Sequence, residues 1–384
     1  MNKFSVFSIA AALLAASLFG TVRLGAQGIQ AGPWISDTGE SSLTVLWTSE
    51  VPGMAYVELE DGTQIYEMYA GRRIFRRLHT IRISGLGRGE CLRYRVCGQN
   101  ILDDSNPRNP KFGDTYEGGW HSVRTFDRKA KSCRFSVFND IHMRTGMYES
   151  LAAQVDSAGT DFLFLNGDIL SAGNYVMDTV VRYGIEPLGT LVNGIPLQFT
   201  RGNHEGRGNN PTVFSDLFPH ADPAPFYYTF RQGPVAFIVF DAGETHEKRS
   251  RLYCGTDVFE EYLNEQIAWA GKAMKDPSWR SAPVKVCLIH VPMIDHEKKD
   301  DYILQRWLNQ HMVPMLNKAG VDLMIGAALQ EHRYCEPGSM GNRCPILVCN
   351  EARRLDFSYT RGGKVNVTIW NPKGVCEFEK ALKP

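Results

Sequence analysis

The stretch Phe135-Ser-Val-Phe-Asn-Asp140-Ile-His142 joins a short apolar run to an acid and an imidazole that are one residue apart. Such a run is typical of a buried β-strand. At the end of an extended strand, side chains at positions i and i+2 point the same way, so Asp140 and His142 can reach one metal ion. The alternative interpretation is an ordinary surface turn after a strand.

Later segments of the chain repeat this arrangement of an apolar run followed by polar side chains. They are Gly167-Asp168 after residues 162–165, Gly202-Asn203-His204-Glu205 after residues 196–200, His290 after residues 284–289, and a partial segment that ends at His332 after residues 321–325. In a layered α/β domain, strands deliver such residues from their carboxyl ends into one cleft. A mixed set of oxygen and nitrogen ligands suits a pair of divalent metals, which points to hydrolysis of a phosphate ester.

The polar residues of these segments differ in what they can do. The carboxylate of Asp168 has two oxygens and can bridge two metals, and Asn203 offers a neutral oxygen ligand. His204 is poorly placed to bind the same metal as Asn203, but it can face a substrate and give a proton to a leaving oxygen. The alternatives are an ordinary polar turn and, for His290, a satisfied core histidine.

Length, composition and charge limit the class of protein. The chain has 384 residues, which fits two domains better than one. Hydrophobic residues make up 43% and charged residues 22%, so we expect a packed globular core. The chain has 42 basic and 42 acidic residues. Bulk charge therefore attracts neither nucleic acid nor anionic membranes.

The N-terminal residues 1–26 read as a signal peptide. Lys3 precedes an apolar stretch over residues 4–19, and small residues lead to Ala26. We therefore expect an exported protein, periplasmic or secreted, with no stable membrane span after cleavage; the alternative is a membrane anchor. The nine cysteines are an odd number, so at least one stays unpaired, and the sequence does not fix the disulfide pattern.

The pattern of elements predicts two domains. Residues 28–127 carry short alternating strands with turn signals between them, which favours an all-β sandwich, and residues 100–119 read as a long loop. A boundary is expected near residues 128–131. Over residues 130–384, strands alternate with helical stretches near 148–158, 257–275 and 301–319, which predicts an α/β domain.

The order of the polar segments is similar to a known motif series. The calcineurin-like metallophosphoesterase superfamily carries D-x-H, G-D, G-N-H-[D/E], H and G-H-x-H, and the first four are present here in that order. The all-β module before them resembles bacterial relatives of purple acid phosphatases, in which it is fibronectin type III-like. Over residues 130–370, the resemblance implies a four-layer α/β/β/α domain. It also implies an enzyme that hydrolyses mono- or diesters of small phosphorylated substrates through a metal-bound hydroxide.

The resemblance also assigns roles within the site, with two metals drawn from manganese, iron and zinc. It implies that Asp140, His142 and His332 bind the first metal, that Asp168 bridges, that Asn203 and His290 bind the second metal, and that His204 is the catalytic histidine. Purple acid phosphatases have a tyrosine where this chain has Ser171. The site therefore resembles the ordinary di-metal type rather than the purple type.

The fifth motif departs from the family pattern. We align G-H-x-H with Leu329-Gln330-Glu331-His332, which puts Gln330 in place of a metal-binding histidine. An amide oxygen is a harder and weaker ligand than imidazole, so the second metal should bind weakly, with manganese or magnesium relatively favoured.

Other interpretations stay open at this stage. One is a catalytically weak or inactive relative that binds a phosphorylated ligand or acts as a scaffold, and another is a carbohydrate-binding or adhesion role for the sandwich. Arg207, His246 and Tyr253 could approach a substrate from loops, although surface roles are the more ordinary interpretation.

Overall fold

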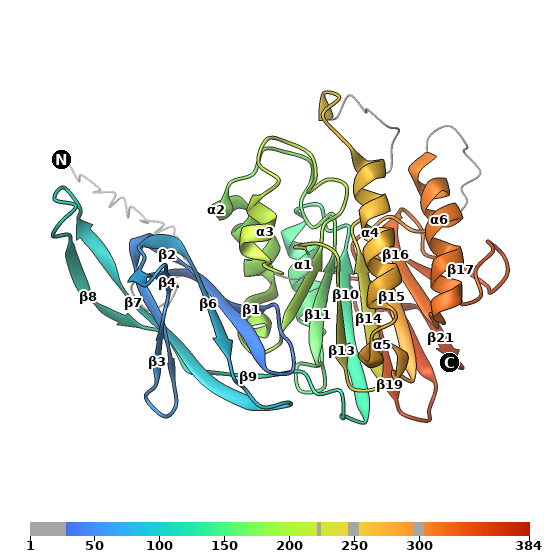
Figure 1. Ribbon diagram of the computed structural model, residues 1–384, viewed down its shortest axis with the longest axis horizontal. Helices are drawn as coiled ribbons and strands as arrows, with labels where there is room; N and C mark the ends of the chain where they lie inside the picture. Colours follow the sequence, from blue (N-terminus) through green and yellow to red (C-terminus); the bar gives the residue numbers. More distant parts are fainter. Residues whose placement is uncertain (1–27, 221–223, 245–252, 295–302) are drawn as a thin grey trace, which may run out of the picture.

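The computed structural model describes residues 28–220, 224–244, 253–294 and 303–384 of the chain. The expected signal peptide, residues 1–26, and His246 lie outside the described residues. Within the described part, no helix is long and apolar enough to cross a membrane. Figure 1 shows a β-rich N-terminal region beside a larger region of mixed helices and strands.

Antiparallel strands form the N-terminal region. They are β1 (Ile29–Ser36), β2 (Ser42–Leu59), β3 (Gln64–Tyr66), β4 (Met68–Tyr69), β5 (Arg72–Arg73), β6 (Arg76–Ser84), β7 (Cys91–Asp103), β8 (Lys111–Glu117) and β9 (His121–Arg124). The first half of β2 pairs with β1 and β6, and its second half pairs with β3 and β7. Side chains from both halves, such as Trp47 and Val57, share one buried core. Seven of the strands form one sheet around this core. We call this all-β region the β-sandwich, and it is consistent with a fibronectin-like domain.

The expected long loop over residues 100–119 is instead mostly a β-hairpin. Strand β7 continues to Asp103 and β8 begins at Lys111, with Ile101 paired to Phe112. Asn100 and Asp103 lie within β7 and Asp114 within β8, because hydrogen bonding to a neighbouring strand outweighs their weak β-propensity.

Two six-stranded sheets form the centre of the larger region. The first sheet has the order β12 (Leu197–Thr200), β11 (Phe162–Asn166), β10 (Ser132–Asn139), β19 (Arg353–Thr360), β20 (Val365–Trp370) and β21 (Cys376–Leu382). The second has the order β13 (Tyr228–Gln232), β14 (Val235–Phe240), β15 (Val284–Ile289), β16 (Leu323–Leu329), β18 (Ile346–Asn350) and β17 (Arg333–Cys335). Strands β10, β11 and β12 run parallel to one another, as do β14, β15 and β16.

Helices cover the outer faces of both sheets, as Figure 1 shows. On the first sheet lie α1 (Thr145–Ala152), α2 (Met177–Val180), η1 (Val181–Ile185), η2 (Glu186–Asn193) and α3 (Val213–Leu217), and on the second lie α4 (Phe259–Ala273), α5 (Pro277–Arg280) and α6 (Ile303–Ala319). The inner faces of the sheets pack on each other through buried aromatic and branched side chains, among them Phe135 and Phe237, whose ring centroids lie 5.2 Å apart. The predicted α/β/β/α layering is confirmed.

The β-sandwich packs directly against helices of the first sheet. The indole nitrogen of Trp34 donates to the carbonyl oxygen of Leu217 over 2.9 Å, and the hydroxyl of Tyr94 donates to the carbonyl oxygen of Asn193 over 2.8 Å. Trp34 also belongs to the same buried cluster as the helices η1, η2 and α3. Since this contact is apolar and hydrogen-bonded, the two regions share a core rather than meeting only through a linker.

Candidate metal centre

Polar residues from both sheets meet where their parallel strands end. Asp140 follows β10, Asp168 lies just after β11, Asn203 lies just after β12, and His290 follows β15 of the second sheet. Asp140, His142 and Asp168 have φ values of 51°, 49° and 50°. Left-handed backbone is uncommon for residues other than glycine and is concentrated at functional sites. These turns direct the side chains over the strand ends instead of continuing the strands.

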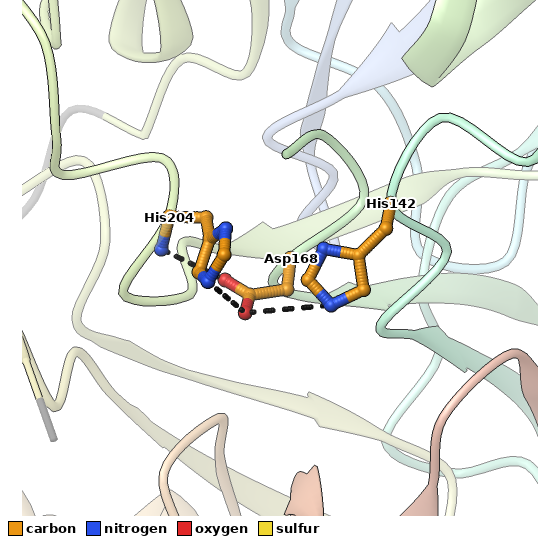
Figure 2. Close-up of side chains that lie close together, drawn as sticks. All are labelled: His142, Asp168 and His204. Carbon is orange, nitrogen blue, oxygen red and sulfur yellow. Dashed lines mark hydrogen bonds and ion pairs between the residues drawn. The ribbon is translucent and has the colours of Figure 1, made fainter. Parts of the chain in front are cut away.

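The carboxylate of Asp168 lies at the centre of the cluster. Its Oδ2 is 3.9 Å from Nε2 of His142, 3.7 Å from Nε2 of His204 and 3.4 Å from Nε2 of His290. Figure 2 shows the imidazoles of His142 and His204 on opposite sides of this carboxylate. Two three-residue sets therefore share Asp168, one with His142 and His204 and one with Asp140 and His290. Within each set the ligand atoms lie within 4.8 Å of one another.

Two nitrogen atoms of the cluster are buried without a hydrogen-bond partner in the described part of the chain. His290 bonds through Nδ1 to the carbonyl oxygen of Asn166 over 2.6 Å, which makes Nδ1 the donor and leaves Nε2 unpartnered toward Asp168. Nδ1 of His204 is likewise buried without a partner. Buried polar atoms are nearly always hydrogen-bonded, and a backbone carbonyl that orients a histidine is a recurrent feature of metal ligands. The donor set therefore fits a divalent metal.

The charges in the cluster are unbalanced when only protein atoms are considered. Burial, helped by the neighbouring Asp168, raises the pKa of Asp140 to about 6. Burial acts on Asp168 in the same direction, but His290 and His204 outweigh it and lower the pKa of Asp168 to about 2. Burial would lower the pKa of His290, whereas the two carboxylates raise it to about 10. A cation bound between these groups would replace the proton that His290 otherwise holds.

Glu205 fixes the loops that carry the ligands, a role that the sequence did not reveal. Its buried carboxylate accepts hydrogen bonds from the backbone amides of Asp168, Leu170 and Gly202, over 2.8, 3.1 and 2.8 Å. It thereby ties the loop after β11 to the loop after β12. A Cβ atom at Gly202 would collide with the Asp168 carboxylate, which explains the glycine at that position.

A pocket of about 270 Å³ opens above this cluster. Its walls include most of the predicted site residues, namely Asp140, His142, Asp168, Asn203, His204 and Gln330. His290 lies fully buried beneath them. Arg207 and Glu351 complete the polar part of the wall. The structure thus brings together residues that are far apart in the sequence, as the expected cleft requires.

His332 is not brought to this pocket. Its side chain is exposed, and its ring lies 5.7 Å from the ring of Phe378 on β21. Strand β16 runs to Leu329, four residues beyond the strand end expected at residue 325, so the turn that follows it presents earlier residues to the pocket. The assignment of His332 to the first metal is therefore corrected.

Ala328 and Gln330 occupy the pocket wall instead. The amide of Ala328 donates to Oδ2 of Asp140 over 3.1 Å, and its φ of 60° turns the chain at the strand end. The fifth motif thus aligns with Ala327-Ala328-Leu329-Gln330 rather than with residues 329–332. In this alignment Ala328 and Gln330 take both positions at which the motif has histidines, so neither imidazole of the fifth motif is present at the pocket.

The chain is similar to known proteins both in its sequence pattern and in its fold. The family model described as calcineurin-like phosphoesterase matches residues 133–327. The solved structure of purple acid phosphatase PPD1 from yellow lupin (Lupinus luteus) seeds matches with a TM-score of 0.65 and 13% identity, covering 91% of this chain and 74% of that chain. GAP50, the anchor in the inner membrane complex of Plasmodium, matches with a TM-score of 0.49 and 12% identity, covering 66% of this chain and 89% of that chain. No curated protein matches the sequence. At these identities the structural likeness shows the fold alone.

Proposed function

The chain belongs to the calcineurin-like phosphoesterase family, and on that premise we propose that it hydrolyses small phosphate mono- or diesters with bound divalent metals. The observation that carries this proposal is the convergence of Asp140, Asp168 and His290 from two different sheets. Nε2 of His290 is buried there without a hydrogen-bond partner. That atom faces the Asp168 carboxylate across 3.4 Å, where a cation could bind between the two groups.

Five retained residues would hold the metals, with Asp168 shared between the two positions. On the family pattern, Asp140 and His142 would complete the first position, and Asn203 and His290 the second, whereas in the metal-free geometry Asp140 groups with His290 and His142 with His204. Metals bound there would polarise phosphoryl oxygens and lower the pKa of water. His204 lies at the rim beside Asp168, where its ring can donate a hydrogen bond to a substrate oxygen. The loss of imidazole at 328 and 330 favours oxygen-preferring metals such as manganese over zinc.

We further propose that the protein is exported, to the periplasm or outside the cell, on the pattern of residues 1–26. We place the boundary between the sandwich and the phosphoesterase domain near residues 128–131. Both proposals rest on the sequence. Mass spectrometry of the N-terminus of protein purified from the natural cell fraction tests the first, and limited proteolysis tests the second.

A second candidate function is the binding of a phosphorylated ligand without turnover. Ala328 and Gln330 favour it, because both histidines of the fifth motif are absent from the pocket wall. In this alternative the site retains affinity for a metal and a phosphate but lacks the ligands that fix both metals for hydrolysis.

Hydrolysis of p-nitrophenyl phosphate and of bis-p-nitrophenyl phosphate tests the choice. We expect turnover when manganese, iron or zinc is added to metal-free protein, and loss of turnover in Asp168→Ala. Phosphate binding without hydrolysis of either compound by any of the three metals would instead support the second candidate.

A further inference from the structure

Arg207 is the one arginine or lysine among the described residues that line the pocket. It follows His204 closely in the chain, and its side chain is only 12% exposed. Two of its groups, Nε and Nη2, each donate to the carboxylate of Glu244 over 2.8 Å. A partly buried cation beside a candidate phosphate site therefore has a fixed position rather than the mobility of a surface arginine.

A second layer of contacts holds Glu244 in place. Its side chain is 1% exposed, and the hydroxyl of Tyr253 donates to Oε2 of Glu244 over 3.1 Å. The same hydroxyl lies 3.4 Å from the carbonyl oxygen of Asn203, so these three side chains, which we call the Arg207 brace, contact a predicted metal ligand. A Cβ atom at Gly206 would lie 3.1 Å from this hydroxyl, so glycine leaves room for it. Arg207, Glu244 and Tyr253 therefore form one hydrogen-bonded unit that contacts the metal loop, the segment after β12 that carries Asn203.

This brace leaves part of the guanidinium available to a ligand. A guanidinium has five N–H donors, and the bidentate bond to Glu244 uses two of them. Arginine with free donors is well suited to the oxygens of a phosphoryl group.

We propose that Arg207, held by Glu244 and Tyr253, binds the non-bridging oxygens of the substrate phosphoryl group and makes the site prefer phosphate monoesters to diesters. A monoester offers one more negative charge and one more non-bridging oxygen than a diester, so it gains more from a fixed guanidinium. This inference rests on the proposed function for its substrate, although phosphate binding itself needs no turnover.

The test measures binding of inorganic phosphate by calorimetry to full-length protein loaded with a stoichiometric amount of Mn²⁺. We expect Arg207→Ala to weaken phosphate binding by about ten- to hundredfold, as for loss of hydrogen bonds between charged groups. Bound Mn²⁺ should be unchanged. Arg207→Lys should recover only part of the affinity, and Tyr253→Phe should weaken binding by about threefold through loss of one hydrogen bond. Where turnover is present, the monoester to diester ratio of kcat/KM should fall in Arg207→Ala.

The matched control is Arg95→Ala, because Arg95 also donates Nε to a glutamate, Glu58, but lies in the β-sandwich. Equal phosphate affinity in Arg207→Ala and in the unchanged protein, at equal metal content, would overturn the proposal. So would a loss of Mn²⁺ in Arg207→Ala and Arg207→Lys, which would make Arg207 a support of the metal loop instead. Absence of hydrolysis in the unchanged protein, with phosphate binding that depends on Arg207, would defeat the proposed function and the monoester preference but leave the role of Arg207 in phosphate binding standing.

Discussion

Histidine meets a carboxylate both in the sandwich, at His79 and Glu67, and at the pocket, at His204, His290 and Asp168. In the sandwich, His79 lies 3.0 Å from Oγ of Ser49 and 3.1 Å from Oε2 of Glu67, so both ring nitrogens have partners. At the pocket, His204 and His290 each keep one buried nitrogen without a partner in the described part of the chain. Residue types alone do not separate these clusters, whereas hydrogen-bond saturation does.

Because the hydrogen-bonding groups of the sandwich cluster all have partners and those of the pocket cluster do not, we expect the two clusters to have different roles. Ser49, His79 and Glu67 have the residue types of a nucleophilic triad, but the Ser49 hydroxyl donates to the carbonyl oxygen of Val51 over 2.7 Å. All three residues are buried, and none of them lines a described pocket near the metal centre. A fully bonded buried network rigidifies a fold, whereas an unsaturated one beside a pocket is ready for a ligand. The sandwich cluster should therefore affect stability and the pocket cluster should affect metal binding.

The largest expected effect is that of Asp168→Ala. Removal of the shared carboxylate should lower metal-dependent turnover by more than about 100-fold, since changes to groups that only support metal ligands already cost up to that much. Elemental analysis should show loss of bound metal as well. Glu67→Gln, which alters the sandwich carboxylate, is the control and should keep both properties. Retention of full metal content in Asp168→Ala would remove the distinction between the two clusters.

The sequence predicted most residues of the pocket cluster, but it did not predict where strand β16 ends. Asp140, Asp168, Asn203 and His290 converge as expected because each follows an apolar run, and apolar runs of this length become buried parallel strands. The error at His332 has a different origin. Strand β16 continues past Ile325, because Gly326 pairs with Val348 and, after an irregularity, Leu329 pairs with Asn350. The small residues between these two pairs give no hydrophobic signal of a strand.

Other features could not be predicted because they depend on tertiary contacts. Glu205 reads as a polar turn residue, yet the folded chain buries it against three amides from two loops. The partnership of Arg207 with Glu244 joins residues 37 positions apart. The sandwich cluster could not be predicted either, because Ser49 and His79 lie on the paired strands β2 and β6, and Glu67 reaches them from the segment between β3 and β4.

The second prediction concerns His79→Ala in the sandwich. This change leaves the Glu67 carboxylate and the Ser49 hydroxyl buried without their shared partner. We expect the free energy of unfolding to fall by roughly 3 kcal/mol, as for loss of one partner from a buried polar or charged pair. Urea denaturation measures the fall, and metal content should stay at the level of the unchanged protein. Altered metal content with unchanged stability would reverse the roles that we assign to the clusters.

Introducing histidine at positions 328 and 330 would supply the two imidazoles that the fifth motif has in the family. We expect Ala328→His combined with Gln330→His to raise zinc affinity by about tenfold or more, because imidazole binds zinc better than an amide or a methyl group does. Competition with a chromophoric chelator measures that affinity. Glu331→His is the matched control, since Glu331 is exposed and does not line the pocket. An equal gain in the control would contradict the alignment of the fifth motif with residues 327–330.

The smallest expected effect is a dependence of the free energy of unfolding on pH that comes from Glu67 in the sandwich cluster. Burial would raise the pKa of Glu67, but hydrogen bonds from His79 and Arg76 outweigh it and bring the pKa below the ordinary value of 4.5. A lowered folded-state pKa means that ionised Glu67 stabilises the fold above pH 4.5, and that this stabilisation is lost as pH falls through the lower value. The difference in free energy of unfolding between the unchanged protein and Glu67→Gln should therefore shrink as pH falls below that value. Urea denaturation with a chelator present, so that the metal centre contributes equally to both proteins, measures this difference. A gap that stays constant with pH would mean that the Glu67 carboxylate is not held ionised by its neighbours.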